Sequence, residues 1–411
     1  MRIIASIYLI YAICLICRNL FVRRKPAAPL DSLRSSHLHF VPIGMATGIV
    51  LTMDYDLAAV AEGMQRELLS VILVWLGLVA GVRFDFRRLG RRASRHHALE
   101  GLQVAGTAAV VFFLALLWRP VLRYQMGIAA EPALVALVLG AAATTLRMPD
   151  LVFYARSELE TPDVGNAPAG PLITNAVGMT LLTFLYPYCA GVTVIELGPF
   201  TMVNPGSFLA LHACTGVLLG LLLTFVFSTL REDVACAIVA TGTVAAFGGL
   251  CAGNAIPGIA VGFISGVWFI NTTTRRRDAL EILEKTTGIL QPVFFLVIGG
   301  LLATQNLPVL RLTAFAFLFL VARSLARGIS LTVAARATRC HLSLTEVIGS
   351  ALRPLGTLSV ALVAQLLLLE SGPNLYALIA AILVAAAIGQ AIPLPKPHTF
   401  PPEAKRTEDL A

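Results

Sequence analysis

The sequence predicts an all-α polytopic membrane protein, and three observations carry this prediction. Of its 411 residues, 57% are hydrophobic and only 13% are charged, whereas a soluble domain has about 25% charged residues. The mean hydropathy is +0.82. Apolar runs of about 20 residues, the length that a helix needs to cross a bilayer, recur along the chain. Because these runs are continuous rather than alternating, the backbone is expected to satisfy its hydrogen bonds in helices and not in a barrel.

The length criterion gives about 13 transmembrane helices. In chain order, the expected spans are 3–22, 38–54, 67–83, 98–118, 131–150, 166–187, 205–229, 233–251, 254–271, 286–303, 309–335, 341–370 and 375–392. Residues 1–392 are expected to form one transmembrane domain, in which the span 3–22 is additional to an internal repeat. The Pro-rich, charged segment 393–411 is expected to be a short disordered cytoplasmic tail.

Short blocks of basic residues between the apolar runs predict the orientation in the membrane. Lys and Arg are enriched in cytoplasmic loops, and the blocks at 23–25, 87–92 and 275–277 fall on one side when crossings alternate. The N-terminus is therefore expected outside and the C-terminus in the cytoplasm, in the plasma (inner) membrane. Arg119 and Arg123 are the exception, because their loop falls outside. This pattern explains the net charge of +8 and needs no nucleic-acid partner.

The cysteines and histidines give no sign of enzyme chemistry. The seven cysteines lie mostly inside apolar runs and lack the spacing of a disulfide framework or a metal site, so they are interpreted as small hydrophobic residues. The sequence contains no His-rich metal motif and no nucleotide-binding glycine pattern in a strand–turn–helix context. We therefore expect neither an enzyme nor a bound metal or cofactor.

Two spans are interrupted by Pro and polar residues at comparable places in the two halves of the chain. Paired interrupted helices favour a transporter binding site, because unwound backbone exposes carbonyl and amide groups to an ion. A proline kink or a simple helix end is the alternative for each. The first break, 144–150, contains Thr144, Thr145, Pro149 and Asp150, and the second, 352–357, contains Arg353, Pro354 and Gly356. Asp150 either pairs with Arg147 at a helix end or faces a cavity.

Three polar residues within apolar runs are further candidates, because charge inside a membrane is functional by default. Arg323 and Arg327 are four residues apart and share a helix face. Arg323 is expected in the site, whereas Arg327 either extends to the cytoplasmic edge or joins it. Asn175 either hydrogen-bonds a neighbouring helix or coordinates a cation. The site is expected between the two breaks, lined by Thr144, Thr145, Asn175 and Arg323.

The order of these features resembles that of the monovalent cation:proton antiporter superfamily, which includes sodium/proton and potassium/proton exchangers. The resemblance covers about 38–392. The segments that carry it are the Gly-rich span 73–85, the break at 140–152, the Gly-rich helix 257–266, the Pro-Phe-Phe helix 291–299, and Arg323 in the following helix. The resemblance implies inverted repeats with two unwound, crossing helices. It also implies a core bundle that moves against a dimerisation bundle, giving alternating access to a midplane site, and a homodimer.

The chain departs from this family in the exchange helix. Where the family has an Asp that binds the cation or protons in turn, this chain has Ala176 after Asn175. Three interpretations remain open. The chain exchanges Na⁺ or K⁺ for H⁺ with a relocated acid, Asp150 being the nearest; or it moves an anion with the help of Arg323; or it has lost transport and acts as a membrane sensor or binding partner. The expected partners are monovalent cations, protons and the lipid bilayer.

Overall fold

A computed structural model describes most of the chain. The described residues are 37–52, 55–89, 94–125, 128, 131–146, 170–189, 195–197, 200–202, 205–254, 256–303, 305, 309–340, 342–369 and 375–391. They form 14 α-helices, one π-helical turn and one two-stranded hairpin. The predicted all-α class is therefore confirmed.

The elements follow the chain in a simple order. Before the hairpin come α3 (Phe40–Thr52), α4 (Tyr55–Val82), α5 (Phe86–Leu89), α6 (Ser94–Leu117), the π turn η1 (Val121–Gln125), α7 (Pro132–Thr144) and α9 (Gly170–Cys189). The hairpin pairs β1 (Ile195–Leu197) antiparallel with β2 (Phe200–Met202). After it come α10 (Pro205–Thr229), α11 (Asp233–Gly253), α12 (Gly258–Thr272), α13 (Arg276–Ala303), α14 (Val309–Thr338), α15 (Leu344–Ala351), α16 (Thr357–Leu369) and α17 (Leu375–Ala391).

Most of the expected spans coincide with helices. Each expected span from 38–54 onward contains helix, and the first, 3–22, lies outside the described residues. Within the described part, six helices are long and apolar enough to cross a membrane, in α4, α6, α10, α11, α13 and α14. These six indicate an integral multi-pass membrane protein. Other apolar helices, such as α7 and α16, have only 13 residues, so the full number of about 13 crossings stays a prediction.

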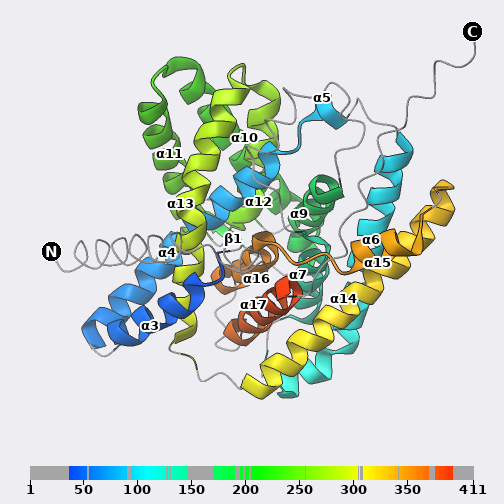
Figure 1. The fold of residues 1–411 in the computed structure, drawn as a ribbon. Coiled ribbons are helices and arrows are strands. Elements are labelled where there is room, and N and C mark those ends of the chain that lie inside the picture. Colours follow the sequence, from blue (N-terminus) through cyan, green and yellow to red (C-terminus); the bar gives the residue numbers. More distant parts are fainter. Residues whose placement is uncertain are drawn as a thin grey trace, which may run out of the picture.

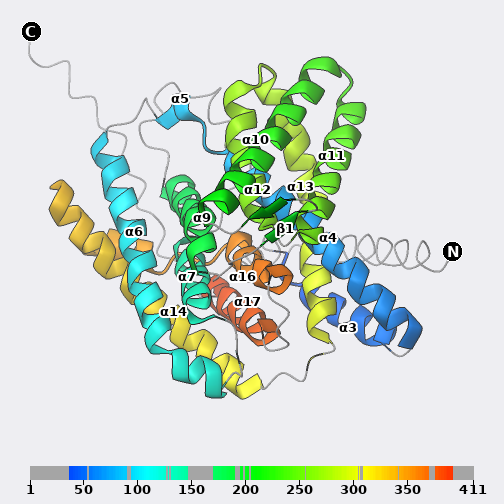
Figure 2. The same cartoon turned by 180° about the vertical axis from the view of Figure 1, so that it is seen from behind.

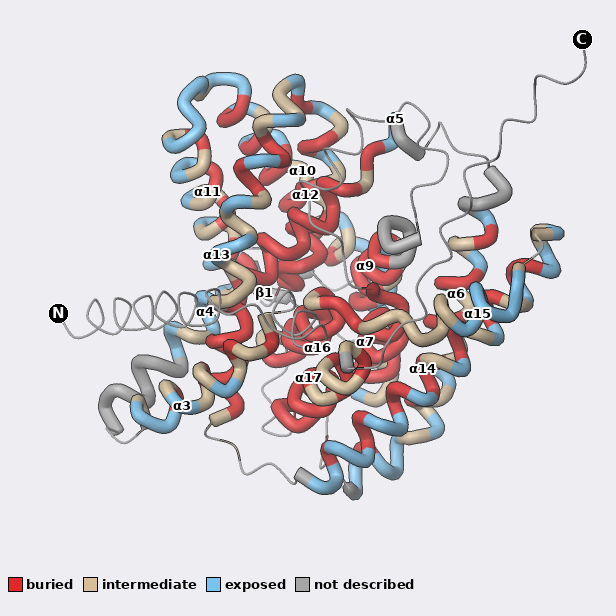
Figure 3. The backbone as a smooth tube through the Cα atoms, in the orientation of Figure 1, coloured by how far each residue is buried: buried red, intermediate tan, exposed pale blue. Residues whose placement is uncertain are grey.

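Helices α7, α16 and α17 lie in the middle of the molecule in both views, between the group α10–α13 and the pair α6 and α14 (Figures 1 and 2). Burial follows this arrangement, since α16 is buried from Leu358 to Leu367 whereas α11 buries a single stripe (Figure 3). A helix that is apolar all round is suited to an interior position. The outward apolar side chains of α11 are where lipid contact is expected.

Glycines bring α4 and α12 into backbone contact. A Cβ atom added at Gly262 would meet the carbonyl oxygen of Val74, and one added at Gly77 would meet that of Ile259. Small residues at a helix interface let two backbones approach closely, which is a main source of helix association in membranes. The Gly-rich segments noted in the sequence therefore serve this close packing.

The structure shows the second expected break in full and the beginning of the first. Helix α7 ends at Thr144, and Thr145 is already extended, with φ −67° and ψ 143°. The expected span 341–370 is divided into α15 and α16 by residues 352–356. Pro354 explains this second break, because it lacks an N–H group and disfavours the helical conformation of Arg353. The part of the first break that contains Pro149 and Asp150 lies outside the described residues.

Candidate functional site

The two breaks meet in the middle of the molecule. The hydroxyl groups of Thr145, directly after α7, and Ser359, in the first turn of α16, form a hydrogen bond although 214 residues separate them. Both side chains are fully buried. We call the meeting place of residues 143–146 and 350–359 the crossing. It brings together two breaks that lie far apart in the sequence.

Arg323 of α14 joins both breaks. Its Nε donates to the carbonyl oxygen of Ala143 at 3.0 Å, its Nη1 to that of Arg353 at 2.7 Å, and its Nη2 to that of Thr145 at 3.3 Å. The side chain is buried, with 1% of its surface exposed. The planar guanidinium group offers five N–H donors in fixed directions, so one side chain can satisfy carbonyl groups from two segments. Arg323 thus links the end of α7 to the segment between α15 and α16.

Arg327 makes the same kind of contact one turn further along α14. Its Nη1 donates to the carbonyl oxygen of Thr144 at 3.3 Å and its Nε to that of Ser350 at 3.2 Å. Only 1% of its surface is exposed. Arg327 is therefore buried between the ends of α7 and α15, beside Arg323. The physical reason is that the last carbonyl groups of a helix have no partner within the helix and need a donor.

These contacts place two positive charges at the C-terminal ends of α7 and α15. Each helix end carries about half a negative charge from its aligned peptide dipoles, so the two arginines leave roughly one positive charge in excess. Among the described residues, neither arginine forms an ion pair with a carboxylate group. The described residues therefore make the crossing electropositive.

Asn175 binds the extended backbone after α7. Its side-chain oxygen accepts a hydrogen bond from the Leu146 N–H group at 2.8 Å, and its Nδ2 donates to the Leu146 carbonyl oxygen at 3.2 Å. The side chain is 1% exposed. Of the two roles expected for Asn175, the structure shows the hydrogen bond to a neighbouring segment. Ala176 beside it is buried in the hydrophobic core.

The hydroxyl groups of Thr144 and Thr145 also bond to their own helix. Thr144 donates to the carbonyl oxygen of Ala141 at 2.7 Å, and Thr145 to that of Ala142 at 2.8 Å. Both side chains are fully buried. These bonds shape the end of α7. Thr144 reaches the crossing through its backbone carbonyl group, which accepts from Arg327, whereas Thr145 reaches it through both its carbonyl group, which accepts from Arg323, and its hydroxyl group, which bonds to Ser359.

The remaining predicted site residues divide into two groups. Arg353, Pro354 and Gly356 form the backbone of the second break, and Arg353 supplies a carbonyl oxygen to Arg323. Pro149 and Asp150 lie outside the described residues. The relocated acid proposed from the sequence is therefore not placed by the structure.

Three further polar residues support the crossing and were not singled out in the sequence. Ser359 bonds to Thr145, as described above. Gln291 of α13 donates to the hydroxyl oxygen of Thr357 at the start of α16. Gln365 accepts a hydrogen bond from the Ile259 N–H group at 3.1 Å, which ties the start of α12 to α16. A polar residue within an otherwise apolar run is the sequence signal that points to each of them.

Comparison with known proteins gives no family for this chain. A scan against protein-family models and a search of characterised proteins both found no match.

Proposed function

We propose that this chain is a secondary transporter that moves a small ion by alternating access. The crossing of two broken helices in the interior carries the proposal. Broken helices near the middle of a membrane protein expose backbone groups that bind ions and substrates, and they recur in secondary transporters. Here Arg323 joins both breaks, with hydrogen bonds to Ala143, Thr145 and Arg353.

Cation:proton antiport is the specific activity that we propose. Exchange needs a group that is charged when it holds the cation and neutral when it holds the proton. Asn175 and Ala176 do not supply it, and the excess positive charge of the crossing favours a nearby carboxylate group. Asp150, five residues after Thr145, is the acid that follows the first break in the sequence. In this mechanism, Asp150 binds Na⁺ or K⁺ and protons in turn.

Anion transport is a second candidate, and one observation favours it. The excess positive charge at the crossing comes from Arg323 and Arg327, which are both 1% exposed. Charged residues inside a membrane mark ion pathways, and an electropositive site attracts anions. In this mechanism no acid is needed, so Asp150 has no part in the movement of the ion.

The test is ion-driven flux in proteoliposomes that contain the purified protein. A dye inside the vesicles reports pH while Na⁺, K⁺ or Li⁺ is added outside, and a second series replaces the cation gradient with a chloride or nitrate gradient. We expect a cation-dependent pH change that Asp150→Asn abolishes. The matched control is Glu281→Gln, because Glu281 is an exposed carboxylate paired with Lys285 on the surface. This control should keep the flux.

The possible outcomes separate the proposals. Cation flux that survives Asp150→Asn contradicts the relocated acid, and flux driven only by the anion gradients contradicts antiport while supporting the second candidate. Folded, inserted protein that gives no flux in either series contradicts secondary transport. The protein would then be a membrane sensor or binding partner.

A further inference from the structure

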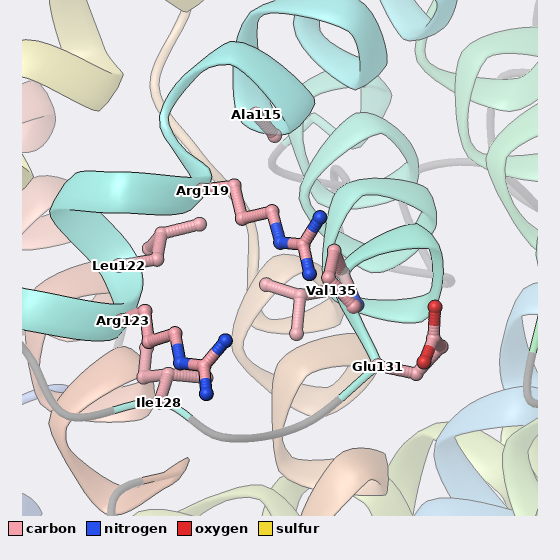
Figure 4. Close-up of a pocket in the computed structure, with 8 residues that line it drawn as sticks. Ala115, Arg119, Leu122, Arg123, Ile128, Glu131 and Val135 are labelled. Atoms are coloured by element: carbon pink, nitrogen blue, oxygen red, sulfur yellow. The ribbon is translucent and has the colours of Figure 1, made fainter.

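A small pocket lies where α6 ends and α7 begins (Figure 4). Its volume is about 190 Å³. It is lined by the charged residues Arg119, Arg123 and Glu131 and by apolar side chains that include Leu122, Ile128 and Val135. These three apolar residues are buried, so the pocket has an apolar floor and a charged margin.

Local chain chemistry shapes the pocket. Pro120 lacks an N–H group, so the regular hydrogen bonding of α6 cannot continue through it. The chain forms the π turn Val121–Gln125, and the Ile128 N–H group closes it on the carbonyl oxygen of Leu122 at 3.0 Å. Single π turns of this kind are frequent at functional sites. Arg119 and Arg123 are four residues apart in the sequence, and both guanidinium groups extend toward the pocket (Figure 4).

The charge of the pocket is unbalanced. Arg119 and Arg123 contribute two positive charges and Glu131 one negative charge. Within the part of the chain that the structure describes, no ion pair joins either arginine to a carboxylate group. Two neighbouring guanidinium groups without a carboxylate partner are suited to a phosphate group, which they can bind with several parallel hydrogen bonds. The pocket is therefore prepared for an anion.

Its surroundings indicate that the anion belongs to a lipid. The candidate span in α6 ends at Leu117, so the pocket lies at one end of a membrane-crossing segment. Leu117 and Phe113 of α6 expose 74% and 63% of their surfaces, so this end of α6 presents large apolar side chains outward, as a helix in contact with lipid does. Tyr124 on the turn is 79% exposed, and tyrosines gather at the level of lipid headgroups.

We propose that this pocket binds an anionic phospholipid, with its phosphate group between Arg119 and Arg123 and its acyl chains in the bilayer beside α6. The proposal also gives a role to Arg119 and Arg123, whose loop is expected outside although basic residues are enriched in cytoplasmic loops. The proposal does not depend on transport, because the pocket lies at the start of α7 and the crossing lies at its other end. The negative charge of Glu131 repels a second anion, so the pocket is expected to bind one phosphate group.

The experiment measures lipid binding to the purified protein in a neutral detergent. Phosphatidylglycerol, phosphatidylcholine and inorganic phosphate are added in separate titrations, with bound lipid counted by native mass spectrometry and Tm recorded alongside. We expect tight binding and a raised Tm with phosphatidylglycerol alone. An arginine near a membrane surface strengthens binding of anionic lipid about fivefold, so Arg119→Gln with Arg123→Gln should weaken it about 30-fold.

Two further variants make the result specific. Arg336→Gln with Arg339→Gln removes the same charge from two exposed positions at the end of α14 that do not line the pocket, and it should keep the affinity of the unaltered protein. Glu131→Gln should bind phosphatidylglycerol several-fold more tightly, which tests the site even if the double arginine variant does not fold. Equal weakening in both double variants, unchanged or weaker binding by Glu131→Gln, or the same Tm shift with inorganic phosphate would each overturn the proposal.

Discussion

At the scale of the residue, the buried polar side chains around the crossing bind main-chain atoms. Arg323 and Arg327 donate to carbonyl groups at two helix ends, and Asn175 pairs with both backbone groups of Leu146. A buried backbone group without a partner costs about 1–3 kcal/mol. The broken helices are therefore possible because side chains from other helices replace the hydrogen bonds that the breaks remove.

The role of Asn175 can be tested by replacing it with alanine. Asn175→Ala leaves the buried N–H and carbonyl groups of Leu146 without their partner, so we expect the folded state to lose about 3 kcal/mol. The loss is measured as a lower Tm of the purified protein in detergent. If Asn175 were instead a cation ligand, the variant would keep its Tm in cation-free buffer and lose only the rise in Tm that the cation produces.

The matched control for this variant is Asn254→Ala. Asn254 donates to the carbonyl oxygen of Leu250 at 2.8 Å, but this hydrogen bond is exposed, at the end of α11. Water can replace this bond, so its loss should cost well under about 1 kcal/mol. Similar Tm values for the two alanine variants would show that Asn175 does not support the break.

At the scale of the element, pairs of glycines determine how closely two helices pack. Gly77 on α4 and Gly262 on α12 each face a carbonyl group of the other helix. The same relation joins α3 and α13, where Gly44 faces Leu296 and Gly299 faces Val41. Such contacts leave no room for a side chain. They fix the distance between the helices more strictly than larger apolar residues would.

Gly262→Ala is therefore expected to be strongly destabilising. The added methyl group would meet the backbone of α4 at Val74, and backbone cannot move aside as a flexible side chain can. Overpacking of this kind costs about 3 kcal/mol. The measurement is again Tm in detergent, together with the yield of folded protein from the membrane.

Gly242 in α11 provides the comparison for this substitution. It is exposed and has no atom within 4 Å of the position that a Cβ would take. Alanine is the better helix former, so Gly242→Ala should be neutral or stabilising by up to about 1 kcal/mol. A Gly262→Ala protein as stable as Gly242→Ala would rule out the close approach of α4 and α12.

At the scale of the whole molecule, large apolar side chains on the outer surface match the membrane assignment. Leu218 and Phe225 of α10 and Ile238 of α11 expose 52%, 65% and 66% of their surfaces. Both helices are among the six that are long and apolar enough to cross a membrane. In water such a surface would favour aggregation, whereas in a bilayer it is the surface that lipid covers.

Leu218→Arg tests this assignment. Leu218 lies near the middle of α10, where an arginine facing lipid opposes insertion by about 3 kcal/mol. We expect a marked loss of protein from the membrane fraction. Leu344→Arg is the matched control, since Leu344 is 74% exposed at the start of the short helix α15, and its yield should be nearly unchanged. An increase of soluble protein with Leu218→Arg would contradict the membrane assignment.

The sequence by itself determined the class of the protein, the places of most helices and the break between α15 and α16. These features depend on local properties, namely the length of an apolar run and the absence of an N–H group at residues such as Pro354. The burial of Arg323 also followed from its place deep within an apolar run.

Only the tertiary structure decided which groups these residues bind. Arg327 is as deep as Arg323 because the ends of α7 and α15 both reach it, and nothing within its own helix indicates this. Asn175 pairs with Leu146, 29 residues earlier, and Thr145 with Ser359, 214 residues later. Such partners depend on how distant helices pack together. The hydropathy of a segment predicts whether that segment is buried. It does not predict the hydrogen-bond partners of its polar side chains, because those partners are backbone groups of other segments.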